Sequence, residues 1–195
     1  MDYEGFKEEW KQACRERHAC TKGYEQFLRS NSIGEILQTA VDNWNDVYRS
    51  KYADFMAANI VRQAEGLEQE FHDAGFYVNE DSDKGICVVC RPDKELHFSG
   101  RARVYIFDKA RVVARGNAKV YCRNAESEIE LHDDAYGEIE AGRVWAYDWA
   151  TVDSHQECWC EGHATVTIYG GELHDKGHRR IIFLRENEQR TVNNE

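Results

Sequence analysis

The sequence of 195 residues contains a single proline, Pro92, and no apolar run approaching the roughly 18 residues that a membrane span needs. The first ten residues, MDYEGFKEEW, are acidic and lack the apolar core of a secretory signal. Hydrophobic residues make up 42% of the chain and charged residues 31%, which excludes the disordered and collagen-like classes. We therefore expect a folded, soluble, cytoplasmic protein whose seven cysteines are reduced thiols.

The sequence also lacks the common catalytic signatures. It has no glycine-rich phosphate loop, no nucleophile elbow and no paired-histidine zinc motif, so we predict no catalytic residue, no cofactor and no metal. The net charge of −11 argues against direct binding of nucleic acid, because phosphate contacts need clustered lysine and arginine.

Residues 1–75 have the apolar spacing of helices. Phe6, Trp10 and Cys14 recur every four residues, which places them on one helix face. Ser32 and Glu35 have the spacing of a capping box, and Gly75 stands where a left-handed residue would end the last helix. We predict three or four helices in this segment.

After Gly75 the apolar period changes from about 3.6 to 2, the period of β-strands. Short strands are expected over 76–99, and the run from Ala102 to Ala125 then repeats one eight-residue unit three times. Each unit opens on a small residue, carries valine at its third place and closes on a turn-former. These residues are Ala102, Ala110 and Ala118; Val104, Val112 and Val120; and Asp108, Gly116 and Asn124.

Repeated octets with strict alternation predict stacked units that cannot cover their own apolar side alone. The fold class is therefore α+β: a helical segment over 1–75, then a parallel β-solenoid over 76–195 with a C-terminal cap. Two or three octets would form one coil, and small inward residues suit a narrow interior. The alternative is an antiparallel meander or barrel of octet-long hairpins. A symmetric homodimer through an uncapped solenoid end is a further expectation.

These units, of the form A-x-V-x-[small]-x-[DGN]-x, resemble the β-helical repeats of uncharacterised proteins from gut-bacterial phages and mobile elements. The resemblance covers residues 99–171 and leaves the helical first third unexplained. It implies a β-solenoid architecture and a mobile-element setting, and it implies no catalytic residue.

Large rings and charges fall on the outward parity of the octets. The rings can be covered by the helical segment or can form a contact surface. Lysine and arginine dominate Phe98–Ala125, and carboxylates dominate Glu126–Glu161. Ion pairs between successive coils are the simpler interpretation of this division, and an acidic surface that imitates nucleic acid is the alternative. The partner-binding residues that we predict are Glu128, Glu130, Glu138, Glu140, Trp145, Tyr147 and Trp149.

Three groups of histidine and cysteine suggest other interpretations. In HQECWCEGH, strand parity sends Cys158 and Cys160 inward and His155 and His163 outward, which opposes a zinc site. The pair in CVVC, Cys87 and Cys90, has redox spacing but lies in an apolar strand-like run, where a thiolate is not stabilised. The third group, Cys14, His18 and Cys20, lacks an oriented third group.

We therefore predict a non-catalytic module that binds a protein partner through an acidic and aromatic solenoid face. The first alternative is a metal- or cysteine-dependent enzyme that uses the segment 155–178, which includes the stretch HDKGHRR. The second is a carbohydrate-binding β-helix that uses the face of Trp145, Tyr147 and Trp149.

Overall fold

The computed structural model describes residues 2–16, 21–50, 53–175, 180–183 and 192–194, and it gives side-chain detail from residue 2 to residue 175 within these ranges. Contacts between Cα atoms divide the chain into two units, Met1–Val78 and Asn79–Glu195. No helix in the described ranges is long and apolar enough to cross a membrane.

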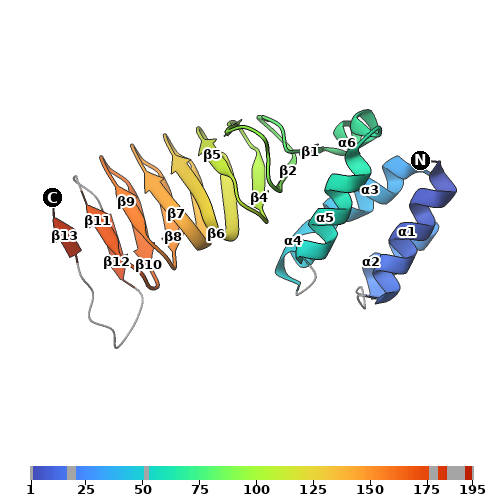
Figure 1. Ribbon diagram of the computed structural model, residues 1–195, viewed down its shortest axis with the longest axis horizontal. Helices are drawn as coiled ribbons and strands as arrows, with labels where there is room; N and C mark the ends of the chain where they lie inside the picture. Colours follow the sequence, from blue (N-terminus) through green and yellow to red (C-terminus); the bar gives the residue numbers. More distant parts are fainter. Residues whose placement is uncertain (1, 17–20, 51–52, 176–179, 184–191, 195) are drawn as a thin grey trace. The chain divides into compact units, whose positions relative to one another are not determined.

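The first unit is helical and ends in the short strand β1, Phe76–Val78 (Figure 1). Its described helices are α1 (Tyr3–Glu16), α2 (Thr21–Arg29), α3 (Ile33–Asp42), α4 (Trp44–Arg49), α5 (Ala53–Ala64) and α6 (Glu68–Ala74). The prediction of three or four helices was wrong. The helical pattern continues across Asn43 and Gly66, but the backbone there leaves the helical path, and Gly66 has a φ of 78°.

The predicted caps of the helical unit are present in modified form. The Ser32 hydroxyl accepts a hydrogen bond of 3.2 Å from the Glu35 amide, while the Glu35 carboxylate accepts one from the amide of Asn31, one residue before the cap. Gly75 ends α6 in the left-handed conformation, with a φ of 87°. The core of this unit contains the fully buried rings of Phe6, Trp44 and Phe71.

The second unit is a parallel β-solenoid of about six turns, which confirms the predicted fold class (Figure 1). Its strands are β2 (Ile86–Val89), β3 (Leu96–Phe98), β4 (Arg103–Ile106), β5 (Arg111–Ala114), β6 (Lys119–Leu131), β7 (Tyr136–Ala146), β8 (Thr151–Ser154), β9 (Cys158–Cys160), β10 (Thr165–Ile168), β11 (Leu173–Asp175), β12 (Arg180–Phe183) and β13 (Val192–Asn194).

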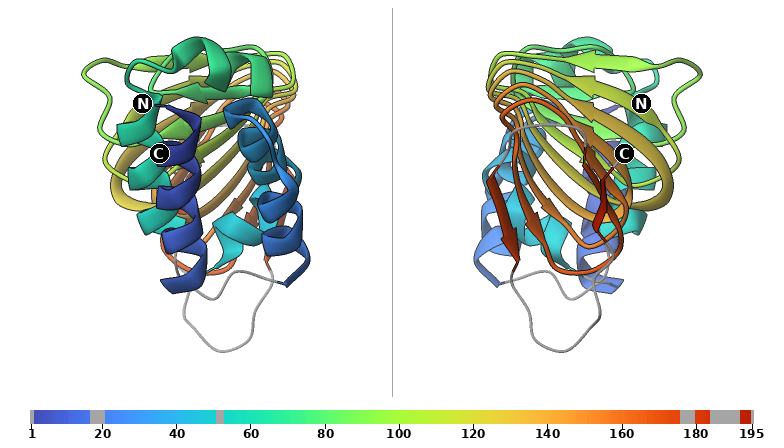
Figure 2. Two further views of the ribbon diagram at one scale, coloured as in Figure 1. Left: turned by 90° about the vertical axis from the view of Figure 1, so that its right-hand side faces the viewer. Right: turned by 90° about the vertical axis from the view of Figure 1, so that its left-hand side faces the viewer.

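Every strand of the solenoid pairs in parallel with the strand one coil away, so the antiparallel alternative is wrong. Face A stacks β2, β4, the first halves of β6 and β7, β8, β10 and β12. Face B stacks β3, β5, the second halves of β6 and β7, β9, β11 and β13. Viewed along the stack, successive coils overlie one another (Figure 2).

One coil contains two octets. On face A, Cys87 is the register partner of Val104, and further along the chain Val152 is the register partner of Val166, so the coils shorten slightly toward the C-terminus. Octets therefore belong alternately to face A and face B. The third-place valines of the three octets are 0–1% exposed, so the parity predicted from the sequence places the apolar side inside.

Two corners join the faces of each coil. The corner that leads from face B back to face A is here called the ridge, and it comprises residues 99–103, 115–119, 132–136, 147–151 and 161–165. The second residue of every run has a positive φ of 55–77°, a region that glycine, asparagine and aspartate tolerate best. These residues are Gly100, Gly116, Asp133, Asp148 and Gly162.

Candidate interaction surface

The outward rings of the C-terminal coils stack into a column on face B. Trp145, Trp159 and His174 are register partners in β7, β9 and β11. The ring centroids of Trp145 and Trp159 lie 4.8 Å apart, and those of Trp159 and His174 lie 4.7 Å apart, with interplanar angles of 12° and 9°. Because the ring spacing matches the spacing of paired strands, each ring rests on the ring of the next coil.

Two shorter ring stacks lie beside this column. His132 and Tyr147 stack at 4.7 Å, and Trp149 and His163 stack at 4.5 Å. Along the chain, every second residue from Trp145 to Trp149 is therefore a ring that points outward. We call the seven rings of the three stacks the aromatic patch; they are His132, Trp145, Tyr147, Trp149, Trp159, His163 and His174.

Trp149 differs from the other rings of the aromatic patch in its exposure. It lies on the ridge, after the end of β7, and 64% of its surface is exposed. Trp145, Tyr147 and Trp159 are half-buried. Trp149 is thus the most accessible large apolar side chain among the described residues.

Face A carries separate ring stacks. Tyr105 and Tyr121 stack at 4.8 Å, and His155 and Tyr169 stack at 4.6 Å. Tyr136 donates a hydrogen bond of 2.7 Å to the Asp153 carboxylate, and burial, with the nearby carboxylate, raises the pKa of its hydroxyl. This hydroxyl stays protonated and holds two coils together.

The predicted partner-binding residues do not all share one surface. Glu128, Glu130 and Trp145 lie on face B, and Tyr147 and Trp149 lie on the adjoining ridge. Glu138 and Glu140 belong to the first half of β7 and lie on face A or its border. The chain passes from one face to the other at Gly142, which has a φ of 114°. The outward side chains have even residue numbers before this corner and odd residue numbers after it, because the alternation shifts by one residue at the corner. Both sets point outward, so alternation alone could not assign them to different faces.

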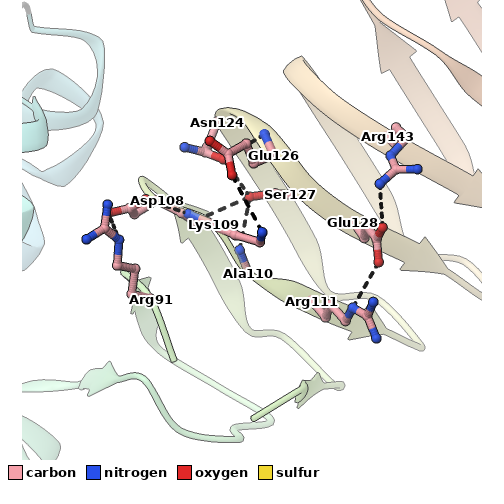
Figure 3. A network of polar contacts seen from close by, with 10 residues as sticks. All are labelled: Arg91, Asp108, Lys109, Ala110, Arg111, Asn124, Glu126, Ser127, Glu128 and Arg143. Atoms are coloured by element: carbon pink, nitrogen blue, oxygen red, sulfur yellow. Dashed lines mark hydrogen bonds and ion pairs between the residues drawn. The ribbon is translucent and has the colours of Figure 1, made fainter. Parts of the chain in front are cut away.

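The carboxylates of the second half of the solenoid pair with cations of neighbouring coils (Figure 3). Glu128 lies between Arg111 and Arg143, at 2.9 Å and 2.5 Å, and Glu140 lies 3.1 Å from Arg123. Such cross-strand pairs contribute about 0.2–1 kcal/mol each. The uneven charge of the sequence therefore serves ion pairing between coils at these positions, and the acidic run does not form a uniform row of free carboxylates.

A buried hydroxyl links two neighbouring coils. Ser127 is fully buried, and its hydroxyl accepts a hydrogen bond of 3.2 Å from the amide of Ala110 and donates to the Asp108 carbonyl or the Asn124 side-chain oxygen (Figure 3). It satisfies polar groups that would otherwise be left without a partner at this corner.

The cysteines of the segment HQECWCEGH point into the solenoid. Cys158 and Cys160 are buried, whereas His155 and His163 are exposed and stack on Tyr169 and Trp149. Burial raises the pKa of the Cys158 thiol. Among the described residues, no group of three histidine, cysteine or carboxylate side chains is placed to hold a metal ion. His178 of the stretch HDKGHRR lies outside the described residues.

Among the described residues, the other two cysteine groups are also poorly placed for redox or nucleophilic chemistry. Cys87 is buried, and burial raises the pKa of its thiol to about 12; its neighbour in the CVVC stretch, Cys90, is half-buried. In the third group only Cys14 lies within the described residues.

The sequence pattern indicated the outward tyrosines and tryptophans but not the histidines that stack on them. The sequence pattern does not reveal the number of residues per coil, which determines which rings stack. His132 and Tyr147 directly follow the register partners Leu131 and Ala146, and Trp149 and His163 have the same sequence spacing as the register partners Val144 and Cys158. Once a coil is known to hold two octets, a ring followed by another ring one coil later predicts a stack.

Comparison with protein-family models, with curated proteins and with solved structures finds no match for this chain. The fold and the aromatic patch are therefore interpreted from their own chemistry.

Proposed function

We propose that this protein is a non-catalytic interaction module that binds a protein partner through the aromatic patch. The observation that carries the proposal is the arrangement of the rings in three stacks, one on face B and two on the ridge beside it. Tryptophan and tyrosine are enriched among the few residues that contribute most of the binding energy at protein interfaces, and rings already fixed by stacking lose little conformational entropy on binding.

Charge supports a partner with a basic contact surface. From Val144 to Asp175 the chain has six carboxylates and no lysine or arginine. Glu130, with 48% of its side chain exposed, is in register with Trp145 and adds a carboxylate beside the rings. Charge complementarity of this kind would speed the encounter with a cationic surface and orient it.

The stacking supports a protein partner over a carbohydrate. A sugar binds an aromatic ring by lying flat on the open face of the ring. Both faces of Trp159 are covered, one by Trp145 and the other by His174, so this ring offers mainly its edge. An edge suits hydrogen bonds and side-chain packing with a protein.

The experiment compares two variants of the full chain as immobilised baits for interacting proteins. Trp145→Ala with Tyr147→Ala removes rings from the aromatic patch, and His155→Ala with Tyr169→Ala removes a ring stack from face A. We expect a partner that binds the natural chain and the second variant, and that binds the first variant at least about tenfold more weakly. Equal retention by both variants, or binding only to a glycan array, would contradict the proposal.

The cellular setting belongs to the same proposal. The likeness of the octets to repeats of phage and mobile-element proteins supports such an origin. All six cysteines within the described residues are free thiols, which supports action in a reducing cytoplasm.

A further inference from the structure

The two corners of the solenoid arrange their charges in different ways. At the corner from face A to face B, cations and carboxylates alternate from coil to coil. Arg91 pairs with Asp108 at 2.8 Å, and Lys109 pairs with Glu126 at 3.5 Å, each with a residue of the following coil. In these first three coils the four charges are therefore paired within the chain.

The ridge separates its charges instead. The first two runs, 99–103 and 115–119, contain only cations among their charged residues, and the next three contain only carboxylates. The cations are Arg101, Arg103, Arg115 and Lys119, and the carboxylates are Asp133, Asp134, Asp148 and Glu161. Within the described part of the chain, none of the four cations forms an ion pair.

This arrangement of charges lowers the stability of a chain whose ridge has no binding partner. Arg103 and Lys119 are register partners, so two positive charges lie on adjacent strands, where like charges are destabilising. Asp133 and Asp148 lie in successive runs, and the amide of Asp133 donates a hydrogen bond of 3.2 Å to the Asp148 carboxylate. These two carboxylates cap backbone amides of the ridge, whereas Asp134 and Glu161 are exposed and have no such role in the described residues. A local pattern that breaks a stability rule is a common sign of function.

An accessible ring lies in the acidic half of the ridge. Trp149 stacks on His163 of the next run, and the residue in its place one run earlier is Asp134. The side of the indole toward Asp134 carries no ring stack in the part of the chain that the structure describes. An open indole face bordered by carboxylates attracts a guanidinium group by the cation–π interaction.

We propose that the ridge binds the ridge of a second copy of this chain, in antiparallel orientation. A two-fold axis across the ridge, between the runs 115–119 and 132–136, places Arg115 and Lys119 opposite Asp133 and Asp134 of the second copy. The same operation places the run 99–103 opposite the run 147–151. Arg101 and Trp149 are the third residues of these two runs, so the guanidinium of one copy faces the indole of the other.

Charge complementarity identifies the occupant as a second copy. An interface around a two-fold axis must be complementary to itself, and a strip with four cations at one end and four carboxylates at the other meets this condition when one copy is reversed. A foreign partner of one charge would match only half of the ridge. This inference does not rest on the proposed function, since it is tested with the purified chain alone.

The test measures the mass of the full chain by sedimentation equilibrium at low ionic strength. We expect a dimer that dissociates as salt is added, because exposed charges are screened beyond about 10 Å at 0.1 M salt. Arg101→Glu with Arg115→Glu leaves the first two runs without net positive charge, and Asp134→Lys reverses a carboxylate that the two-fold axis places opposite Arg115 and Lys119. Each variant alone should dimerise at least about tenfold more weakly, because each reversal acts twice in a symmetric interface.

Mixing the two variants provides the decisive comparison. The two variants should form a heterodimer with each other, because the reversed charges of one then face reversed charges of the other, and its formation also shows that both variants are folded. Lys94→Glu with Lys109→Glu changes the net charge as the first variant does, but at the other corner, and should leave the dimer unchanged. The inference is overturned if the natural chain is monomeric up to about 0.1 mM, a concentration that reveals even weak dimers. It is also overturned if the reversals leave a dimer intact or if the mixed variants do not associate.

Discussion

Single residues at the ridge determine whether the coils can close. The second residue of each ridge run must adopt a left-handed backbone, and the chain uses glycine or aspartate there. Asp133 and Asp148 add a hydrogen bond, because each side chain accepts an amide hydrogen from the preceding run. The sequence predicted turn-formers at the end of each octet, but it could not show that the ridge is left-handed in every described coil whereas the other corner is left-handed only in some, as at Arg91 with a φ of 47°. Asp108 closes an octet without a positive φ.

Substitutions at two of these glycines distinguish the cost of a left-handed backbone from the cost of a steric clash. A Cβ atom on Gly100 would lie 2.5 Å from the backbone oxygen of Asp83, whereas one on Gly116 would meet nothing closer than 3.5 Å. We expect Gly100→Ala to lower the free energy of unfolding by about 1–3 kcal/mol. Gly116→Asn should cost less than about 1 kcal/mol, because asparagine tolerates this conformation. Urea denaturation measures both; equal losses would contradict the explanation.

The buried thiols make the solenoid sensitive to alkali. Burial raises the pKa of Cys122 to about 11 and that of Cys87 to about 12, from a usual value of 9.0. Above pH 9 the unfolded thiols lose their protons while the folded ones keep theirs, so the free energy of unfolding falls as the pH rises. For each such thiol the slope is about 1.4 kcal/mol per pH unit until its folded pKa is reached.

Cys122→Ala tests this pH dependence. The variant should show a shallower decline of stability between pH 9 and about pH 11, by about 1.4 kcal/mol per unit, whatever its stability at pH 7. Val120→Ala, at a fully buried position of the same strand without a titratable group, is the control and should leave the slope unchanged. Parallel curves for the Cys122→Ala variant and the natural chain would show that the Cys122 thiol does not titrate in this way.

At the scale of elements, alternation predicted which side chains each strand turns inward. In the sequence, the alternation of the octets slips by one residue near Ala125 and near Gly142. The structure absorbs them within the long strands β6 and β7, which turn the corner without a break, with register shifts between Cys122 and Glu128. Alternation shows which side chains point outward but not on which face they lie, and the inward parity shifts by one residue where each of these strands turns the corner.

The ion-pair ladder of face B should contribute measurably to stability. Glu128 is 27% exposed and bridges Arg111 and Arg143, so Glu128→Gln leaves two guanidinium groups without the charge between them. We expect a loss of about 0.5–1.5 kcal/mol at low salt that shrinks as salt is added. Glu126→Gln, whose side chain is 73% exposed and whose single partner lies at 3.5 Å, should cost less than about 0.5 kcal/mol. A salt-independent loss for Glu128→Gln would argue against an electrostatic cause.

The ring column of face B should behave as one stacked unit. Trp159 has ring neighbours on both sides, so Trp159→Leu removes two stacking contacts and should cost about 1–3 kcal/mol. It should also abolish the exciton signal of the Trp145–Trp159 pair in circular dichroism. Trp149→Leu removes one contact of a largely exposed ring and should cost less than about 1 kcal/mol, with the exciton signal retained. Loss of that signal in both variants would mean that it does not arise from this pair.

At the scale of the molecule, the octets predicted stacking of strands but not the size of the coil. Two or three octets per coil satisfy the same alternation, because every octet buries the same kinds of residue. The presence of two octets in each coil determines which rings stack, which ions pair and which face each carboxylate occupies. Glu138 and Trp145 appeared to share a surface in the sequence for this reason, although they lie on opposite sides of a corner. The helical segment was predicted from apolar spacing and from caps at Ser32 and Gly75, which do not reveal the breaks at Asn43 and Gly66.

The central claim is that alternate octets stack as parallel strands in register, one coil apart. Interstrand NOEs between backbone protons test it most directly. The structure predicts NOEs between Val104 and Val120 and between Val112 and Ile129, with the pattern of parallel strands, although each pair is separated by a whole coil in the sequence. Hα–Hα NOEs of antiparallel pairing between consecutive octets, such as those of Val104 and Val112, would contradict it.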